Sequence, residues 1–136
     1  MKFNHVANRL DTRHFDTIVA MMKDKLGFIE LRQTERSIWL RQPGTNVDLQ
    51  FSRSETAHRD ADKRRSQVSF LTDAPQQALS LLADWLGLRG LEAIVGSYSE
   101  REFYLDVPDA FVDFVLEAML PELADYRMDG QTQAGR

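Results

Sequence analysis

The stretch Gln67-Val68-Ser69-Phe70-Leu71 opens the second half of the chain as Asn4-His5-Val6-Ala7-Asn8-Arg9-Leu10 opens the first. In both stretches the residues alternate in character with a period of two, which is the pattern of a β-strand. A helical pattern follows each stretch, and three more strand-like runs follow each helix. The order strand, helix, strand, strand, strand therefore occurs twice, and it predicts two βαβββ motifs in tandem.

Apolar residues at helical spacing predict one helix in each half, at 15–25 and at about 75–86. Gly27 follows the first helix, where glycine commonly ends a helix. A short terminal helix is expected within 117–126. Alternating runs between turns predict the strands, at 2–10, 28–32, 37–41, 46–52, 67–71, 91–95, 102–106 and 110–116.

The chain is expected to form a single domain, because 136 residues suffice for one hydrophobic core and are too few for two independent ones. We assign residues 1–53 to the first motif and residues 66–118 to the second. Residues 54–65 carry crowded charges of both signs and almost no apolar side chain, so a solvated charged linker is expected there. Residues 119–136 form a C-terminal extension with a polar end.

The amino-acid composition argues against several classes of function. The net charge of −4, from 17 basic and 21 acidic residues, gives no electrostatic basis for binding nucleic acid. Cysteine is absent, which excludes disulfides, thiolate metal ligands and a cysteine nucleophile. No apolar run approaches the roughly 20 residues that cross a bilayer, and no signal peptide follows Met1. We therefore expect a cytoplasmic protein without a membrane partner.

Two βαβββ motifs, with Leu26-Gly27-Phe28 after the first helix and Pro108-Asp109 before the last strand, resemble the vicinal oxygen chelate superfamily. This superfamily includes glyoxalase I, extradiol dioxygenases, fosfomycin-resistance enzymes and bleomycin-resistance binding proteins. The resemblance covers about residues 2–118. It implies an α+β fold whose tandem motifs form a cupped mixed sheet with helices outside. It also implies a homodimer, because small members of the family build their cavities from motifs of both subunits.

Metal-dependent members of the superfamily place one ligand on the first and last strand of each motif. By this resemblance, the corresponding positions here are His5, Asp48, Gln67 and Asp113. His5 has the commonest residue type for its position, whereas Gln67 replaces a histidine and the two aspartates replace glutamates. The turn before Asp113 is one residue shorter than the common pattern. Such a set suits Mn²⁺, Mg²⁺, Fe²⁺, Ni²⁺ or Zn²⁺, and Asp113 or Asp48 would be the catalytic base.

The same four residues also have a structural interpretation. The imidazole and the amide would then form hydrogen bonds within the cup, and the two carboxylates would face water or pair with Arg9 or Arg41. Other residues are candidates for contacts with a flat or apolar substrate, with core packing as the alternative for the aromatic ones. These candidates are Trp39, Phe51, Tyr104 and Arg101.

Two functions of different class follow from the resemblance. In the first, a divalent metal in a cup-shaped cavity binds a small oxygen-bearing substrate, and the protein is a metal-dependent lyase, isomerase or dioxygenase. In the second, the protein holds no metal and sequesters a small-molecule ligand, as bleomycin-resistance proteins do. Inward carboxylates would then favour a cationic ligand. The scaffold hosts both classes, so the sequence leaves open whether the chain is an enzyme.

Overall fold

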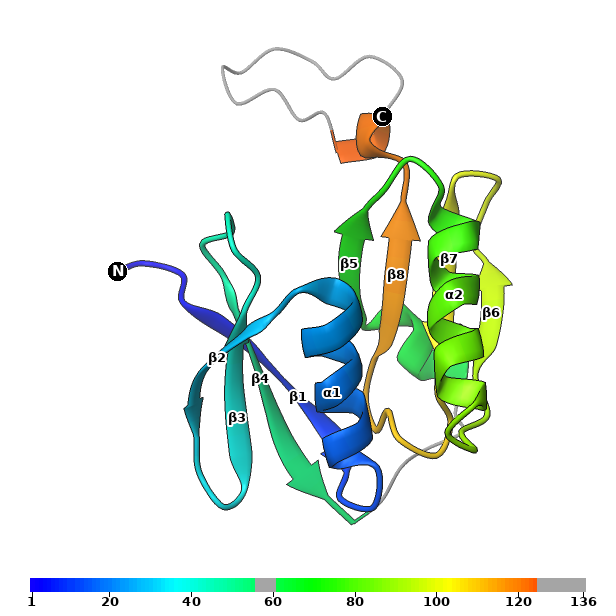
Figure 1. The fold of residues 1–136 in the computed structure, drawn as a ribbon. Coiled ribbons are helices and arrows are strands. Elements are labelled where there is room, and N and C mark those ends of the chain that lie inside the picture. The colour runs from blue at the N-terminus through cyan, green and yellow to red at the C-terminus, as the bar shows by residue number, and fades with distance from the viewer. Residues whose placement is uncertain (56–60, 125–136) are drawn as a thin grey trace.

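The computed structural model describes residues 1–55 and 61–124. Residues 56–60 of the predicted linker and 125–136 of the predicted C-terminal extension lie outside the described residues. The α+β class and the tandem βαβββ order are confirmed (Figure 1). The strands are β1 (His5–Asp11), β2 (Ile29–Gln33), β3 (Ser37–Arg41), β4 (Asp48–Ser54), β5 (Gln67–Leu71), β6 (Ile94–Ser97), β7 (Glu102–Asp106) and β8 (Val115–Met119).

Each motif forms its own four-stranded mixed sheet. The first motif makes sheet A, with strand order β1-β4-β3-β2, and the second makes sheet B, with strand order β5-β8-β7-β6. The first and last strands of each motif are parallel neighbours, and the other neighbouring strands are antiparallel. The register places His5 beside Asp48 in sheet A and Gln67 beside Val115 in sheet B. The two sheets therefore repeat the same topology.

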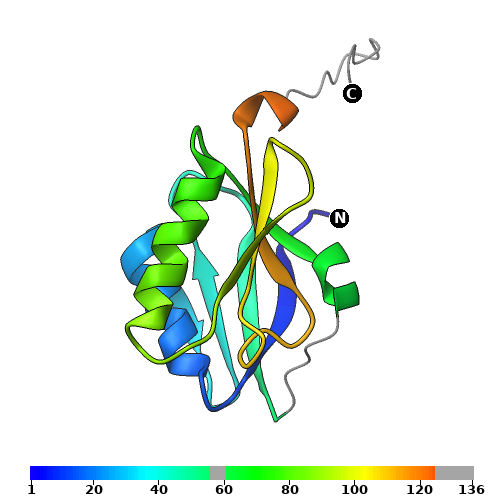
Figure 2. The ribbon, with the colours of Figure 1, turned by 90° about the vertical axis from the view of Figure 1, so that its right-hand side faces the viewer.

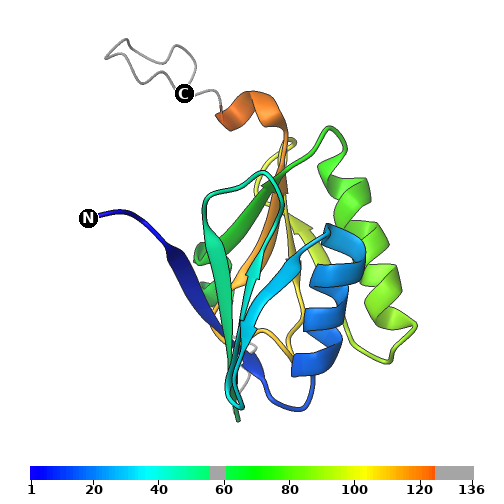
Figure 3. The same cartoon turned by 60° about the vertical axis from the view of Figure 1, so that its left-hand side comes forward.

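One helix per motif packs against the sheets, α1 (Phe15–Leu26) in the first and α2 (Pro75–Gly87) in the second. Gly27 ends α1 with a φ of 72°, a left-handed conformation that glycine adopts without a steric penalty. Pro75 opens α2, where its missing N–H costs no helical hydrogen bond. Both helices lie on the same side of the molecule (Figure 3). Their buried stripes are Phe15, Ile18, Val19, Met21 and Met22 on α1 and Leu79, Leu82 and Leu86 on α2.

A single hydrophobic core joins the two motifs. Phe114 stacks on Phe51, with ring centroids 5.7 Å apart, and on Phe111 at 4.5 Å. Phe28 meets Phe70 edge to face at 6.1 Å. Aromatic contacts of this kind are worth roughly 1 kcal/mol each beyond the area that they bury. Because Phe28 and Phe51 belong to the first motif and the other three rings to the second, these contacts fix the motifs against each other.

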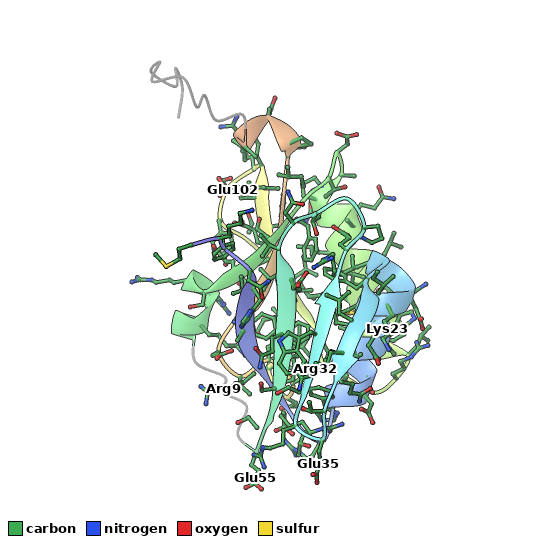
Figure 4. All side chains as sticks on the ribbon, turned by 90° about the vertical axis from the view of Figure 1, so that its left-hand side faces the viewer. Arg9, Lys23, Arg32, Glu35, Glu55 and Glu102 are labelled. Carbon is green, nitrogen blue, oxygen red and sulfur yellow. The ribbon has the colours of Figure 1, made fainter. Side chains whose placement is uncertain are left out.

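Each sheet has a second face turned away from this core, which we call its outer face. Along β4, Leu49 and Phe51 point into the core, whereas Asp48 and Gln50 lie on the outer face of sheet A. Figure 4 looks onto this face and labels Arg9. In sheet B, Figure 2 shows α2 on one side and a short 3₁₀ helix on the other.

The last strand begins later than predicted. A strand was expected over 110–116, but β8 is Val115–Met119. Residues 110–112 instead pair with the end of β1 through two backbone hydrogen bonds and an isolated bridge. This run is apolar because it fills the core between the sheets, where Phe111 is fully buried. Asp113 consequently lies in the loop before β8 and not on the strand.

The described part of the predicted linker is solvated only in part, because Glu55 and Arg65 are exposed whereas Lys63 is buried. Residues Ala61–Arg65 form the 3₁₀ helix η1, which lies against the outer face of sheet B (Figure 2). Lys63 is only 7% exposed, because its Nζ lies 2.8 Å from Asp106 Oδ1 and donates to the carbonyl oxygen of Phe111. A run of mixed charge predicts exposure to solvent, and the burial of Lys63 could not be predicted from it because that burial depends on the distant residue Asp106.

β6 and the C-terminal end of the described chain also differ from the predicted elements. β6 spans Ile94–Ser97 instead of 91–95. The beginning of the terminal helix predicted over 117–126 belongs to β8, and the described chain ends with the 3₁₀ helix η2 (Pro121–Ala124). None of the helices in the described part of the chain has the length and apolar character needed to cross a membrane.

Candidate functional site

Asp48 is well placed beside His5, but both of its carboxylate oxygens are already in use. His5 and Asp48 are Cα partners on parallel strands, so they share the outer face of sheet A. Arg41 donates from Nε to Asp48 Oδ1 at 2.6 Å and from Nη2 to Oδ2 at 3.1 Å. Asp48 in turn raises the pKa of Arg41 above its ordinary value. A bidentate guanidinium neutralises this carboxylate and competes with any metal ion for it.

Asp113 is likewise engaged by an arginine. Its carboxylate accepts the backbone N–H of Arg9 at 3.1 Å and the Arg9 Nε at 3.2 Å. Arg9 lies four residues along β1 from His5, so Asp113 is held near the opposite end of that strand. Asp48 and Asp113 thus form the two arginine pairs that the structural interpretation of the sequence described.

Gln67 belongs to a different surface from the other three predicted ligands. It is exposed at the start of β5, and its Nε2 donates to the carbonyl oxygen of Arg64 at 3.2 Å. Its Cα partner on β8 is Val115, which is fully buried and has no ligating atom. The second motif therefore has an apolar residue opposite Gln67, where the first motif has Asp48 opposite His5. The nearest carboxylate on the same side of β8 belongs to Glu117.

The four predicted ligands do not form one donor set in this conformation. Within residues 1–55 and 61–124, no three side chains of histidine, aspartate or glutamate form a group that could hold a metal ion. His5 and Asp48 share a face, while Gln67 lies on the other sheet and Asp113 is drawn to Arg9. The predicted metal site therefore stays a prediction.

The four predicted substrate contacts have different environments. Phe51 is fully buried, so it is a core residue and is not available to a ligand. Trp39 is half-buried on the outer face of sheet A, as the Cα partner of Gln50. The guanidinium of Arg32, which Figure 4 labels, lies 5.1 Å from the Trp39 ring centroid. Arg101 is exposed in the loop between β6 and β7. Tyr104 is 8% exposed and lies on the outer face of sheet B.

The outer face of sheet B carries a row of interacting residues. Ser69, Glu117, Tyr104 and Gly96 are successive Cα partners across all four strands, and we call them the Glu117 row. The Ser69 hydroxyl donates to Glu117 Oε1 at 2.7 Å, and Glu117 is 6% exposed. The Tyr104 ring lies against Gly96, where any β-carbon would overlap it. Glycine at this position therefore creates the space that the ring fills.

Tyr98 and η1 close over the Glu117 row. The Tyr98 ring lies 5.1 Å from the Tyr104 ring, measured between centroids, at an angle of 51°. Burial raises the pKa of Tyr98, a hydrogen bond with Gln67 offsets part of that rise, and the charge of Glu117 adds to it. The Tyr98 hydroxyl and the Gln67 amide both donate to the Arg64 carbonyl oxygen. The Arg64 guanidinium lies 4.8 Å from the Tyr104 centroid, so this arginine covers the row.

A crevice of about 260 Å³ opens where the two motifs meet, and we call it the inter-motif crevice. Its polar groups are uncharged and belong to Gln42, Thr45, Gln67 and Ser69. Apolar walls with a few polar groups are typical of sites that bind small molecules. The walls come from both motifs and are formed by Val6, Phe28, Val47, Leu49, Val68 and Phe70.

Of the Glu117 row, the sequence predicted a functional role only for Tyr104, and it gave no role to Glu117 or to Lys63 and Arg64 of η1. Glu117 was assigned to the terminal helix because the last strand was predicted too early. A signal was present, since Glu117 is the one charged residue within the apolar run 114–120, and a carboxylate in such a run is often buried with a partner. Lys63 and Arg64 gave no comparable signal, because they lie in a run of mixed charge.

No protein-family model matches the sequence, and no curated protein sequence matches it. Solved structures match its fold. Lactoylglutathione lyase from Agrobacterium tumefaciens has a TM-score of 0.55 and 12% identity, covering 92% of this chain and 97% of that one. The fosfomycin resistance protein FosX from Listeria monocytogenes, solved with Mn(II) and sulfate, has a TM-score of 0.52 and 8% identity, covering 88% of each chain. The bleomycin-binding protein from Streptomyces verticillus, solved with copper(II)-bleomycin, has a TM-score of 0.51 and 18% identity, covering 88% and 98%.

Proposed function

Because the chain has the fold of the vicinal oxygen chelate superfamily, we propose that it binds a small molecule in the inter-motif crevice. The observation that carries this proposal is the lining of the crevice, in which apolar walls from both motifs surround a few uncharged polar groups. A volume of about 260 Å³ is near the lower end of ligand pockets, which favours a small ligand. The amides of Gln42 and Gln67 would orient it by hydrogen bonding.

Binding without turnover is the function that the geometry supports best. The two predicted catalytic bases, Asp48 and Asp113, are each held by an arginine and neither lines the crevice. The residues that do line it have no group that titrates near neutral pH and could move a proton. This agrees with the metal-free sequestration that the sequence left open. One of the matching structures is described as a bleomycin-binding protein.

A second candidate is a metal-dependent reaction on an oxygen-bearing substrate. The observation that favours it is the common face of His5 and Asp48. A divalent ion bound there would supply Lewis-acid polarisation of substrate oxygens. Arg41 would first have to release both oxygens of Asp48, so the residues as placed do not fit the ion.

The proposal includes a homodimer. The outer face of sheet A is open to solvent and carries apolar groups, with Ile29 50% exposed and Trp39 half-buried. His5 lies on this face and Gln67 on the other sheet, and both outer faces point away from the shared core. We place the contact between the two copies of the dimer, which the resemblance implies, on this open face of sheet A.

A thermal-shift screen of small molecules on EDTA-treated protein tests the binding function. Each stabilising compound is then titrated by calorimetry into wild type, Val47→Asp and Leu88→Asp. Val47→Asp places a charge on the crevice wall, which disfavours an apolar ligand. Leu88 is 87% exposed just after α2, so the same change there is a matched control.

We expect Val47→Asp to weaken binding by about tenfold or more, equal to about 1.4 kcal/mol, and Leu88→Asp to leave it unchanged. Compounds that bind all three proteins equally would place the ligand elsewhere. Compounds that bind only after Mn²⁺ is added, and not to His5→Ala, would support the metal-dependent candidate instead.

A further inference from the structure

Glu117 is a buried carboxylate on the outer face of sheet B. It is 6% exposed and accepts one hydrogen bond, from the Ser69 hydroxyl. Among the residues that the structure describes, no lysine, arginine or histidine forms a salt bridge with it. A buried carboxylate is costly unless a cation or several donors compensate its charge. The environment of Glu117 is therefore suited to one additional positive group.

The side chains beside Glu117 are of the type that recognises organic cations. Tyr104 is its Cα partner on β7, and the Tyr98 ring lies 5.1 Å from the Tyr104 ring. The faces of aromatic rings attract guanidinium and ammonium groups, and the attraction increases when the cation is removed from water. Two tilted aromatic rings and one carboxylate are thus neighbours on the outer face of sheet B.

The Arg64 guanidinium already lies beside Tyr104, but it makes only part of the contacts that a guanidinium could make there. This guanidinium lies 4.8 Å from the Tyr104 centroid. Its Nε, however, is buried and has no hydrogen-bond partner among the described residues, and the guanidinium forms no salt bridge with Glu117. An arginine that stacks on the ring and leaves a buried donor unpaired does not satisfy the carboxylate beside it.

The backbone of η1 explains the incomplete fit. The preceding residue, Lys63, is anchored by Asp106, with 2.8 Å between Nζ and Oδ1. The carbonyl oxygen of Arg64 accepts hydrogen bonds from Tyr98 and Gln67. These contacts fix the Arg64 backbone, so its side chain reaches the tyrosine ring but not the carboxylate. A free cation has no such restraint.

We propose that Tyr98 and the Glu117 row form a binding site for a small organic cation of the guanidinium class, and that Arg64 is its tethered competitor. A free guanidinium stacks on the two tyrosines and donates a bidentate pair to Glu117. The site goes beyond the ligand proposed for the inter-motif crevice. Ser69 belongs to both the Glu117 row and the crevice lining, but neither Arg64 nor Glu117 lines the crevice. Variants at these two positions therefore test the cation site separately from the crevice.

Ethylguanidinium is the probe, and ethylurea is its neutral control of the same shape. Both are titrated by calorimetry into wild type and Arg64→Ala at millimolar concentrations, well below those that denature proteins. Removing the competitor raises the fraction of protein with an open site. We expect ethylguanidinium to bind Arg64→Ala about tenfold or more tightly than wild type, and ethylurea to bind neither measurably.

Two further variants separate this site from general stacking. Glu117→Gln in the Arg64→Ala background removes the carboxylate's charge and is expected to abolish ethylguanidinium binding. Arg89→Ala removes an arginine whose guanidinium carbon lies 3.4 Å from the Trp85 ring centroid on the surface, and it is expected to bind the probe no better than wild type. Equal binding of both probes by Arg64→Ala, or equal gains in Arg89→Ala, would overturn the proposal.

Arg64→Gln serves if Arg64→Ala does not fold, because it keeps the length of the side chain and removes the charge. Thermal stability gives an independent readout. Ethylguanidinium is expected to restore the melting temperature of the Arg64 variant toward that of wild type, whereas ethylurea is not. Absence of rescue, together with absence of calorimetric binding, would show that the Glu117 row is a structural cluster only.

Discussion

Lys63 and Asp106 form an ion pair 2.8 Å long whose side chains are only 4% and 6% exposed. The pair fastens η1 to sheet B and so determines where Arg64 lies. Removing one member of a buried ion pair leaves the other charge uncompensated, at a cost of about 3–5 kcal/mol. We expect Lys63→Met to lower the free energy of unfolding by about 3 kcal/mol in urea denaturation. The double variant Lys63→Met/Asp106→Leu should recover most of that loss, and a single variant as stable as wild type would contradict the buried pair.

Asp11 gives the protein a component of acid sensitivity. Its carboxylate accepts three hydrogen bonds from Arg13, which hold the pKa of Asp11 below the ordinary value of 3.8. A lowered folded-state pKa contributes stability above the unfolded value, and this stability is lost as the pH falls through the folded value. Wild type should therefore exceed Asp11→Asn in free energy of unfolding at about pH 6, with the difference shrinking toward about pH 2. A difference that is constant with pH would contradict this role.

Gly96 is expected to tolerate no side chain. A β-carbon there would overlap the Tyr104 ring, which is itself 8% exposed and covered by Arg64. Overpacking of this kind costs about 1–3 kcal/mol, so Gly96→Ala should lower the free energy of unfolding by that amount. Gly87→Ala is the matched control, since a β-carbon at this helical position meets nothing within 4 Å. It should be neutral or stabilising by up to about 1 kcal/mol, and equal losses in both variants would remove the steric argument.

The proposed homodimer predicts a selective effect at Ile29. This residue is 50% exposed on the outer face of sheet A, as the Cα partner of Arg41. A carboxylate at the centre of a self-association surface is disfavoured when buried. Sedimentation velocity should show a dimer for wild type and for Leu88→Asp, and a shift toward monomer for Ile29→Asp. A wild-type monomer, or dimers in all three proteins, would place the interface elsewhere or remove it.

The order of elements could be predicted because it depends on local patterns. Alternation at Gln67 and His5, helical spacing after each, and Gly27 at the end of α1 are all visible in a single sequence. The start of β8 could not be placed, because the apolar run from Ala110 to Leu116 suits both a strand and a core loop. Only tertiary pairing with β1 decides between them.

The site was harder to predict than the fold, because its chemistry depends on pairing between strands. Because β8 begins a few residues later than predicted, the residues paired with β5 include Val115 and Glu117, and Asp113 is not among them. Pairing of Asp48 and Asp113 with Arg41 or Arg9 was predicted as an alternative, and the structure pairs Asp48 with Arg41 and Asp113 with Arg9. The burial of Lys63 had no local signal, because it results from one long-range contact with Asp106.

The most direct test of the proposed function is a map of ligand-induced NMR shifts on isotope-labelled, EDTA-treated protein. The strongest compound from the screen is titrated while backbone amide signals are followed. We predict that the largest shifts occur at Val47, Val68 and Phe70 around the inter-motif crevice, without added metal. Shifts confined to His5, Arg41 and Asp48, and seen only after Zn²⁺ is added, would contradict the account and establish the metal-dependent site in its place.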